Sequence, residues 1–180
     1  MKRAAPFILA VATSAFIGRI LVGQQPATPR PRQPLPIAEL GPASITITGI
    51  GGSSVTITAA DLYAMPQQTV KATDHGREVT FQGVLLTDVL ARVKTPTGEA
   101  FNKTVASYYV LVEAADGYKA LFSWAEVDPT FSDRKVYVVL KRDGTPIPAK
   151  DGTFELIVPG EKRYSRWVRQ VTALKIRQVD

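Results

Sequence analysis

The residues best suited to chemistry in this sequence lie near its carboxyl end. Lys162, Arg163, Arg166 and Arg169 form a basic cluster after the Pro159-Gly160 pair. Arg166 and Arg169 are three residues apart, so in a helical turn their guanidinium groups would share one face. Because a planar guanidinium donates two hydrogen bonds at once to a carboxylate or phosphate, the cluster predicts a shallow anion site. The alternative is a solvated basic face whose side chains pair with acidic neighbours: Asp151, Glu155 and Glu161.

The second candidate is His75, the only histidine of the chain. An imidazole can bind a metal ion, but a site of three or four ligands needs companions, and Asp74 is the only adjacent one. The alternative is a turn residue with an exposed ring, because Asp74-His75-Gly76 has the composition of a turn. The chain has no cysteine, which excludes disulfides, thiolate metal ligands and cysteine nucleophiles. Neither a Gly-rich phosphate loop nor a nucleophile elbow is present.

Short strands must position these candidates. Alternation of polar and apolar residues predicts most of the strands, and the turn at His75 lies between two of them. Asp116-Gly117 has the composition of a tight hairpin turn. Residues 136–140 are a continuous apolar run, typical of a buried central strand. Strands are expected at residues 44–48, 55–58, 69–73, 78–81, 108–112, 118–122, 136–140, 154–158 and 172–177.

Helices are expected to be few and short. Thr58 with Asp61, and Ser123 with Glu126, have the spacing of capping boxes that begin a helix. Thr87 is expected to cap a helix over residues 88–93. Together with the strands, this predicts an α+β domain with a mixed sheet and no helix longer than about four turns.

The composition suits one globular domain behind an export segment. The chain has 180 residues, of which 45% are hydrophobic, enough for a sizeable core. Residues 1–23 have a basic start and an apolar run, typical of a signal peptide; the alternative is an uncleaved N-terminal anchor. Residues 24–42 are a Pro-rich linker, and residues 43–180 are the folded domain. A periplasmic or secreted protein is therefore expected, with membrane contact only through an uncleaved N-terminal segment.

The charge balance argues against a nucleic-acid partner. The formal net charge is +6, but three of the basic residues lie in the export segment. Without Lys2, Arg3 and Arg19, the 22 basic residues fall to 19, against 16 acidic ones. Nucleic-acid binding needs a concentrated basic face, which this balance does not indicate.

Segments in the same order resemble the molybdopterin-binding domain of the sulfite oxidase family. They are residues 55–66 (VTITAADLYAMP), 81–90 (FQGVLLTDVL), 114–118 (AADGY) and the carboxyl-terminal run from RDGTPIP to DGTFELIVPG with its basic stretch. The resemblance covers about residues 44–178. It implies the strand-rich mixed-sheet fold of that domain, molybdopterin as cofactor and an oxidoreductase activity.

The sequence departs from that family where the cofactor would bind. The metal-binding cysteine has no counterpart, and His75, or Asp74, stands near its place. Only six residues separate Gly76 from Gly83, where the family inserts a segment that wraps the pterin. Glu155 replaces a family arginine. The resemblance leaves cofactor-binding candidates but no catalytic residue and no metal ligand; the candidates are His75, Lys162, Arg163, Arg166 and Arg169.

These departures favour a non-catalytic function. The chain is expected to bind a small anionic ligand or a periplasmic protein. The alternative is a molybdopterin-dependent oxidoreductase with a non-cysteine metal site, and a purely structural module is a third class. The missing cysteine, the shortened wrap and the absence of a twin-arginine signal all favour binding without catalysis.

Overall fold

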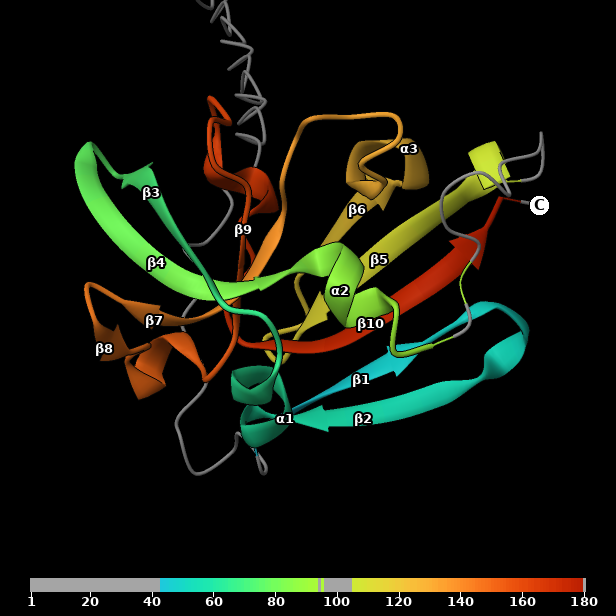
Figure 1. Ribbon diagram of the computed structural model, residues 1–180, viewed down its shortest axis with the longest axis horizontal. Helices are drawn as coiled ribbons and strands as arrows, with labels where there is room; N and C mark the ends of the chain where they lie inside the picture. The colour runs from blue at the N-terminus through green and yellow to red at the C-terminus, as the bar shows by residue number, and fades with distance from the viewer. Residues whose placement is uncertain (1–42, 94, 96–104, 180) are drawn as a thin grey trace, which may run out of the picture. The chain divides into compact units, whose positions relative to one another are not determined.

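The computed structural model describes residues 43–93, 95 and 105–179. This part of the chain is strand-rich, with ten strands in two sheets and only short helices (Figure 1). The strands are β1 (Ser44–Thr48), β2 (Ser54–Thr58), β3 (Gln68–Asp74), β4 (Arg77–Leu85), β5 (Tyr108–Ala114), β6 (Lys119–Ser123), β7 (Tyr137–Arg142), β8 (Thr145–Pro146), β9 (Glu155–Ile157) and β10 (Val171–Gln178).

The helices are one or two turns long. Three are α-helical: α1 (Ala59–Ala64), α2 (Leu86–Leu90) and α3 (Trp124–Val127). Four are single 3₁₀ turns: η2 (Ile50–Gly52), η4 (Val105–Ser107), η5 (Ala149–Asp151) and η6 (Tyr164–Arg166). The expectation of no long helix is therefore confirmed for the described residues. None of the helices in these ranges is long and apolar enough to span a membrane.

The first sheet joins both ends of the folded region. Its order is β2-β1-β10-β5-β6, and β1 runs parallel to β10 while the other neighbours are antiparallel. The predicted hairpin at Asp116-Gly117 joins β5 to β6 and is confirmed. Because β1 and β10 come from opposite ends of the folded sequence, their pairing closes the fold (Figure 1).

The second sheet carries the elements that form the site. Its order is β3-β4-β7, and β8 and β9 both pair with the far side of β7. A bulge between Gln82 and Gly83 shifts the register of β4 against β7. A Cβ atom on Gly83 would lie 2.2 Å from the carbonyl oxygen of Val138, so only glycine fits this close approach.

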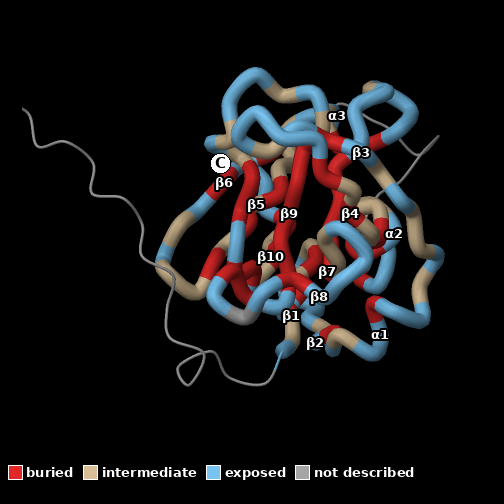
Figure 2. Tube along the Cα trace, turned by 90° about the vertical axis from the view of Figure 1, so that its left-hand side faces the viewer, coloured by how far each residue is buried: buried red, intermediate tan, exposed pale blue. Residues whose placement is uncertain are grey.

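One apolar core draws on both sheets. Val138 and Val139 of β7, and Leu156 and Ile157 of β9, are fully buried, as expected for a central strand and its neighbour. Figure 2 shows buried segments of β7, β9 and β10 at the centre and exposed turns around them. The predicted apolar runs at residues 136–140 and 154–158 therefore do form the centre of the fold.

The starts of the helices agree with the sequence at two places and differ at a third. Both capping boxes form, at Thr58 with Asp61 and at Ser123 with Glu126. The expected cap at Thr87 is wrong, because α2 begins at Leu86 and Thr87 lies inside it. The N–H of Leu86 donates to the carbonyl of Val136, 2.8 Å away, so the residue just before β7 takes the place of a local cap.

Candidate functional site

The β3–β4 hairpin places His75 at its tip. His75 and Gly76 form a two-residue turn with φ values of 48° and 83°, the positive values that a tight hairpin requires. The His75 side chain is 71% exposed, and its ring centre lies 5.1 Å from that of Tyr164. The interpretation of His75 as an exposed turn residue therefore describes its position correctly.

The segment after β9 forms an aromatic wall opposite this turn. Tyr164 in η6 contacts Trp167 edge to face, with ring centres 5.2 Å apart. Trp167 is buried, packs against Phe81 of β4 and donates from Nε1 to the carbonyl of Val158, 3.0 Å away. The wall is therefore anchored in the core and holds Tyr164 against His75.

The floor of the site is a buried carboxylate. Glu155 in β9 is 1% exposed, and its Oε2 lies 3.1 Å from Nη2 of Arg142 in β7. The same Arg142 nitrogen lies 3.4 Å from Oδ2 of Asp74 in β3. One guanidinium group thus bridges carboxylates from two other strands of the sheet.

The surroundings of Glu155 change its affinity for protons. Burial raises the pKa of Glu155 to about 7, because the charged form loses its hydration. Arg142 and Arg169 oppose this rise, whereas the charges of Asp151 and Asp74 add to it. Glu155 therefore changes its protonation state near neutral pH, as groups that exchange protons with ligands do.

Arg169 lies beside this floor with its hydrogen-bond donors unused by its acidic neighbours. Its Nη1 is 3.6 Å from Asp151 Oδ1, and its Nε is 3.9 Å from Glu155 Oε1. Both distances exceed those of an N–H···O hydrogen bond, about 2.7–3.2 Å. The Arg169 side chain is 46% exposed. The two carboxylates hold the guanidinium group in place electrostatically while leaving it accessible.

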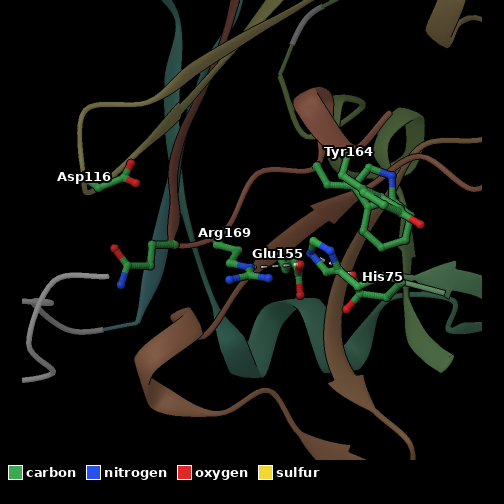
Figure 3. Close-up of a pocket in the computed structure, with 8 residues that line it drawn as sticks. His75, Asp116, Glu155, Tyr164 and Arg169 are labelled. Carbon is green, nitrogen blue, oxygen red and sulfur yellow. Dashed lines mark ion pairs between the residues drawn. The ribbon is translucent and has the colours of Figure 1, made fainter. Parts of the chain in front are cut away.

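These side chains surround a cavity of about 240 Å³. Figure 3 shows Arg169 and Glu155 near its centre, with His75 and Tyr164 on one side and Asp116 on the other. Asp116 lies in the β5–β6 turn, so both sheets contribute to the site. The other lining residues are Asp74, Trp167 and Gln170.

The structure separates the five candidates that the sequence grouped. His75 and Arg169 line the cavity. Arg166 binds Glu126, 2.7 Å away, and Glu161, and it lies over the ring of Phe122. Lys162 and Arg163 are exposed and do not line the cavity.

The expectation that Arg166 and Arg169 share one helical face is wrong. The turn η6 ends at Arg166, and the chain is extended at Trp167, so the three-residue helical spacing does not apply. Hydrogen bonds from Arg166 and Ser123 outweigh the effect of burial and lower the pKa of Glu126. Arg166 therefore belongs to an ion-pair network that stabilises the packing of α3, whereas Arg169 belongs to the cavity.

The floor of the site was not identified from the sequence. Glu155 was named only as an acidic neighbour of the basic cluster and as a departure from a family, and Arg142, Tyr164 and Gln170 were not singled out at all. A lone glutamate in a strand predicted to be buried was the available signal, because a buried carboxylate needs a partner. Among the described residues, no group of three acidic or histidine side chains is arranged to hold a metal ion.

Comparisons with known proteins bear on the fold. No protein-family model matches the sequence, and no curated protein does. Among solved structures, the chain is similar to that of the sulfane dehydrogenase SoxCD from Paracoccus pantotrophus, with 21% sequence identity and a TM-score of 0.55. The similarity covers 76% of this chain and only 39% of that one. At this identity, the similarity is one of fold.

Proposed function

We propose that this chain is an exported, non-catalytic domain with the fold of sulfite oxidase-type enzymes, and that it binds a small anionic ligand in the cavity beside Arg169. The order of the sequence motifs and the similarity to the sulfane dehydrogenase structure support the fold assignment. The basic and apolar segment at residues 1–23 supports export. A carboxylate on a periplasmic protein would meet the same guanidinium group as a free anion.

The accessibility of Arg169 is the observation that carries the proposal. Its guanidinium group lies at a cavity, half-exposed, with its acidic neighbours beyond hydrogen-bond distance. A ligand carboxylate or similar oxyanion there would accept two parallel hydrogen bonds. The His75 and Tyr164 rings border the same space, so an apolar group on the ligand would pack against them.

The residues present do not fit molybdopterin. The cavity of about 240 Å³ is smaller than the roughly 300–1,000 Å³ typical of sites for ligands of drug size. Asp74, Asp116 and Glu155 line it, where a phosphate dianion would need positive charge. The chain also has no cysteine to supply a thiolate. The site therefore gives no support to an oxidoreductase reaction through that cofactor.

Calorimetry on the purified chain with acetate, benzoate and inorganic phosphate tests the proposal. Arg169→Gln removes the charge and at least one charge-assisted hydrogen bond, which contributes about 1.5–3 kcal/mol, so anion binding is expected to weaken at least about 10- to 150-fold. Arg163→Gln is the matched control, because it removes the same side chain at an exposed position outside the cavity. The proposal is wrong if no probe binds, or if both variants bind as well as the unchanged protein at constant ionic strength.

A further inference from the structure

We infer that the cavity selects singly charged ligands with a flat apolar body, and that Glu155 takes up a proton when such a ligand binds. This inference rests on the binding site proposed above. It assigns the class of ligand from the charges around the cavity and gives Glu155 a role in specificity.

The charges around the cavity favour a ligand with one negative charge over a ligand with two. Three carboxylates line the space, those of Asp74, Asp116 and Glu155, and that of Asp151 lies beside Arg169. Only two guanidinium groups, those of Arg142 and Arg169, lie among them. Arg142 already donates to Glu155 and pairs with Asp74, and it is not among the residues that line the cavity. Arg169 is therefore the one arginine that lines the cavity in the described structure. Its guanidinium group offers one positive charge to a ligand. A second negative charge on the ligand would be repelled by Asp74 and Asp116, and no further arginine or lysine among the lining residues would offset that repulsion.

The wall of the cavity favours a flat apolar body. The rings of His75 and Tyr164 are tilted by 39° with centres 5.1 Å apart, and Trp167 follows behind Tyr164. All three side chains line the cavity. Aromatic rings that pack against each other at such distances stabilise a complex by more than the burial of their apolar surface area alone. A benzoate-like ligand would place its carboxylate on Arg169 and its ring against this wall.

The proton uptake follows from competition for Arg169. In the free protein, Arg169 is one of two cations that favour the charged form of Glu155. A bound anion shares that guanidinium group and adds a negative charge near a side chain that is 1% exposed, so protonated Glu155 becomes favoured. The groups that face Glu155 or line its cavity come from each neighbouring element: Asp74, His75, Asp116, Arg142, Asp151, Tyr164 and Arg169.

The expected pH dependence has a definite sign. Below about pH 7, the free protein already carries the proton on Glu155, because its pKa is about 7, so binding takes up little more. Above pH 7, binding requires one proton to be taken up, and affinity falls by up to about tenfold per pH unit. Proton uptake should therefore be close to one per ligand at pH 8 and small at pH 6.

Calorimetry at both pH values, with benzoate and phenyl phosphate as probes, tests this inference. Two buffers that differ in ionisation enthalpy are used at each pH, Tris and triethanolamine at pH 8 and Bis-Tris and imidazole at pH 6. The difference in binding heat between the two buffers gives the number of protons taken up. At pH 8, benzoate is expected to bind at least about tenfold more tightly than phenyl phosphate. Glu155→Gln should bind benzoate without proton uptake at either pH. Asp116→Asn is the matched control, since it removes another cavity carboxylate and should keep the uptake.

The outcomes separate this inference from the proposed site. Binding that depends on Arg169 but favours phenyl phosphate would overturn the charge selectivity and leave the site intact. Proton uptake that persists in Glu155→Gln would overturn the role of Glu155. Absence of any binding that depends on Arg169 would overturn the site itself, and the inference with it.

Discussion

At the level of single residues, Glu155 determines the properties of the cavity. It is almost fully buried on β9, beside the central strand β7, and one cation, Arg142, hydrogen-bonds to it. A second cation, Arg169, is close enough for attraction but too far for a hydrogen bond. This asymmetry leaves Arg169 available to a ligand. Burial raises the pKa of Glu155 to about 7, so this side chain can hold a proton near neutral pH.

The raised pKa of Glu155 predicts how stability depends on pH. Between the unfolded value of 4.5 and the folded value of about 7, the folded protein holds a proton that the unfolded chain has released. The free energy of unfolding therefore decreases as pH rises through this interval, by about 3 kcal/mol in total, and is constant with respect to this group above it. Glu155→Gln should remove that decrease.

Urea denaturation at pH 4.5, 6 and 8 measures the effect. The exposed Glu78 of β4 provides the control, because Glu78→Gln should leave the pH dependence as it is. An equal decrease of stability in the unchanged protein and in Glu155→Gln would mean that another group takes up the proton.

At the level of elements, the sequence predicted features that depend on neighbouring residues and missed features that depend on residues distant in the chain. The capping boxes at Thr58 and Ser123 form as predicted, because each needs only residues within one turn. The cap at Thr87 failed because a carbonyl of the distant Val136 satisfies the first helical N–H. The bulge at Gly83 was also not predicted, since it arises from the approach of β7.

The bulge gives a direct test of the second sheet. In Gly83→Ala, the new methyl group would lie within 3 Å of three backbone atoms of β7, which cannot rotate away. We expect a loss of about 3 kcal/mol of unfolding free energy, the upper end for overpacking. Gly117→Ala is the control: its φ is 81° but nothing lies within 4 Å, so about 1 kcal/mol is expected. Equal losses in the two variants, measured by urea denaturation, would contradict the bulge geometry.

At the level of the whole molecule, the sequence predicted the class of fold but not its assembly. Strand periodicity indicated nearly every strand, and the α+β class with short helices is confirmed. The sheets are two rather than one, and the parallel pair of β1 with β10 joins segments more than 120 residues apart. Such pairings depend on packing across the core, which periodicity does not report.

The site shows the same division between local and long-range information. His75 was placed correctly in a turn because the turn composition is local. The Arg142 bridge between Asp74 and Glu155 joins three strands, and no spacing along the chain reveals it. Arg166 and Arg169 looked equivalent in the sequence. Because η6 ends at Arg166, the two side chains point to different partners: Arg166 binds Glu126, and Arg169 lies beside Asp151.

The central claim is that a small anion binds at Arg169, and an NMR titration of ¹⁵N-labelled protein with benzoate tests it most directly. We expect the Arg169 Nε–H signal to shift in a saturable manner, together with signals of Asp74, His75, Tyr164 and Gln170, which line the same cavity. Signals of Arg163 and Arg166 should stay unchanged, because both lie outside it. Saturable shifts at Arg163 or Arg166 with none at Arg169, or no saturable shift anywhere, would contradict the account.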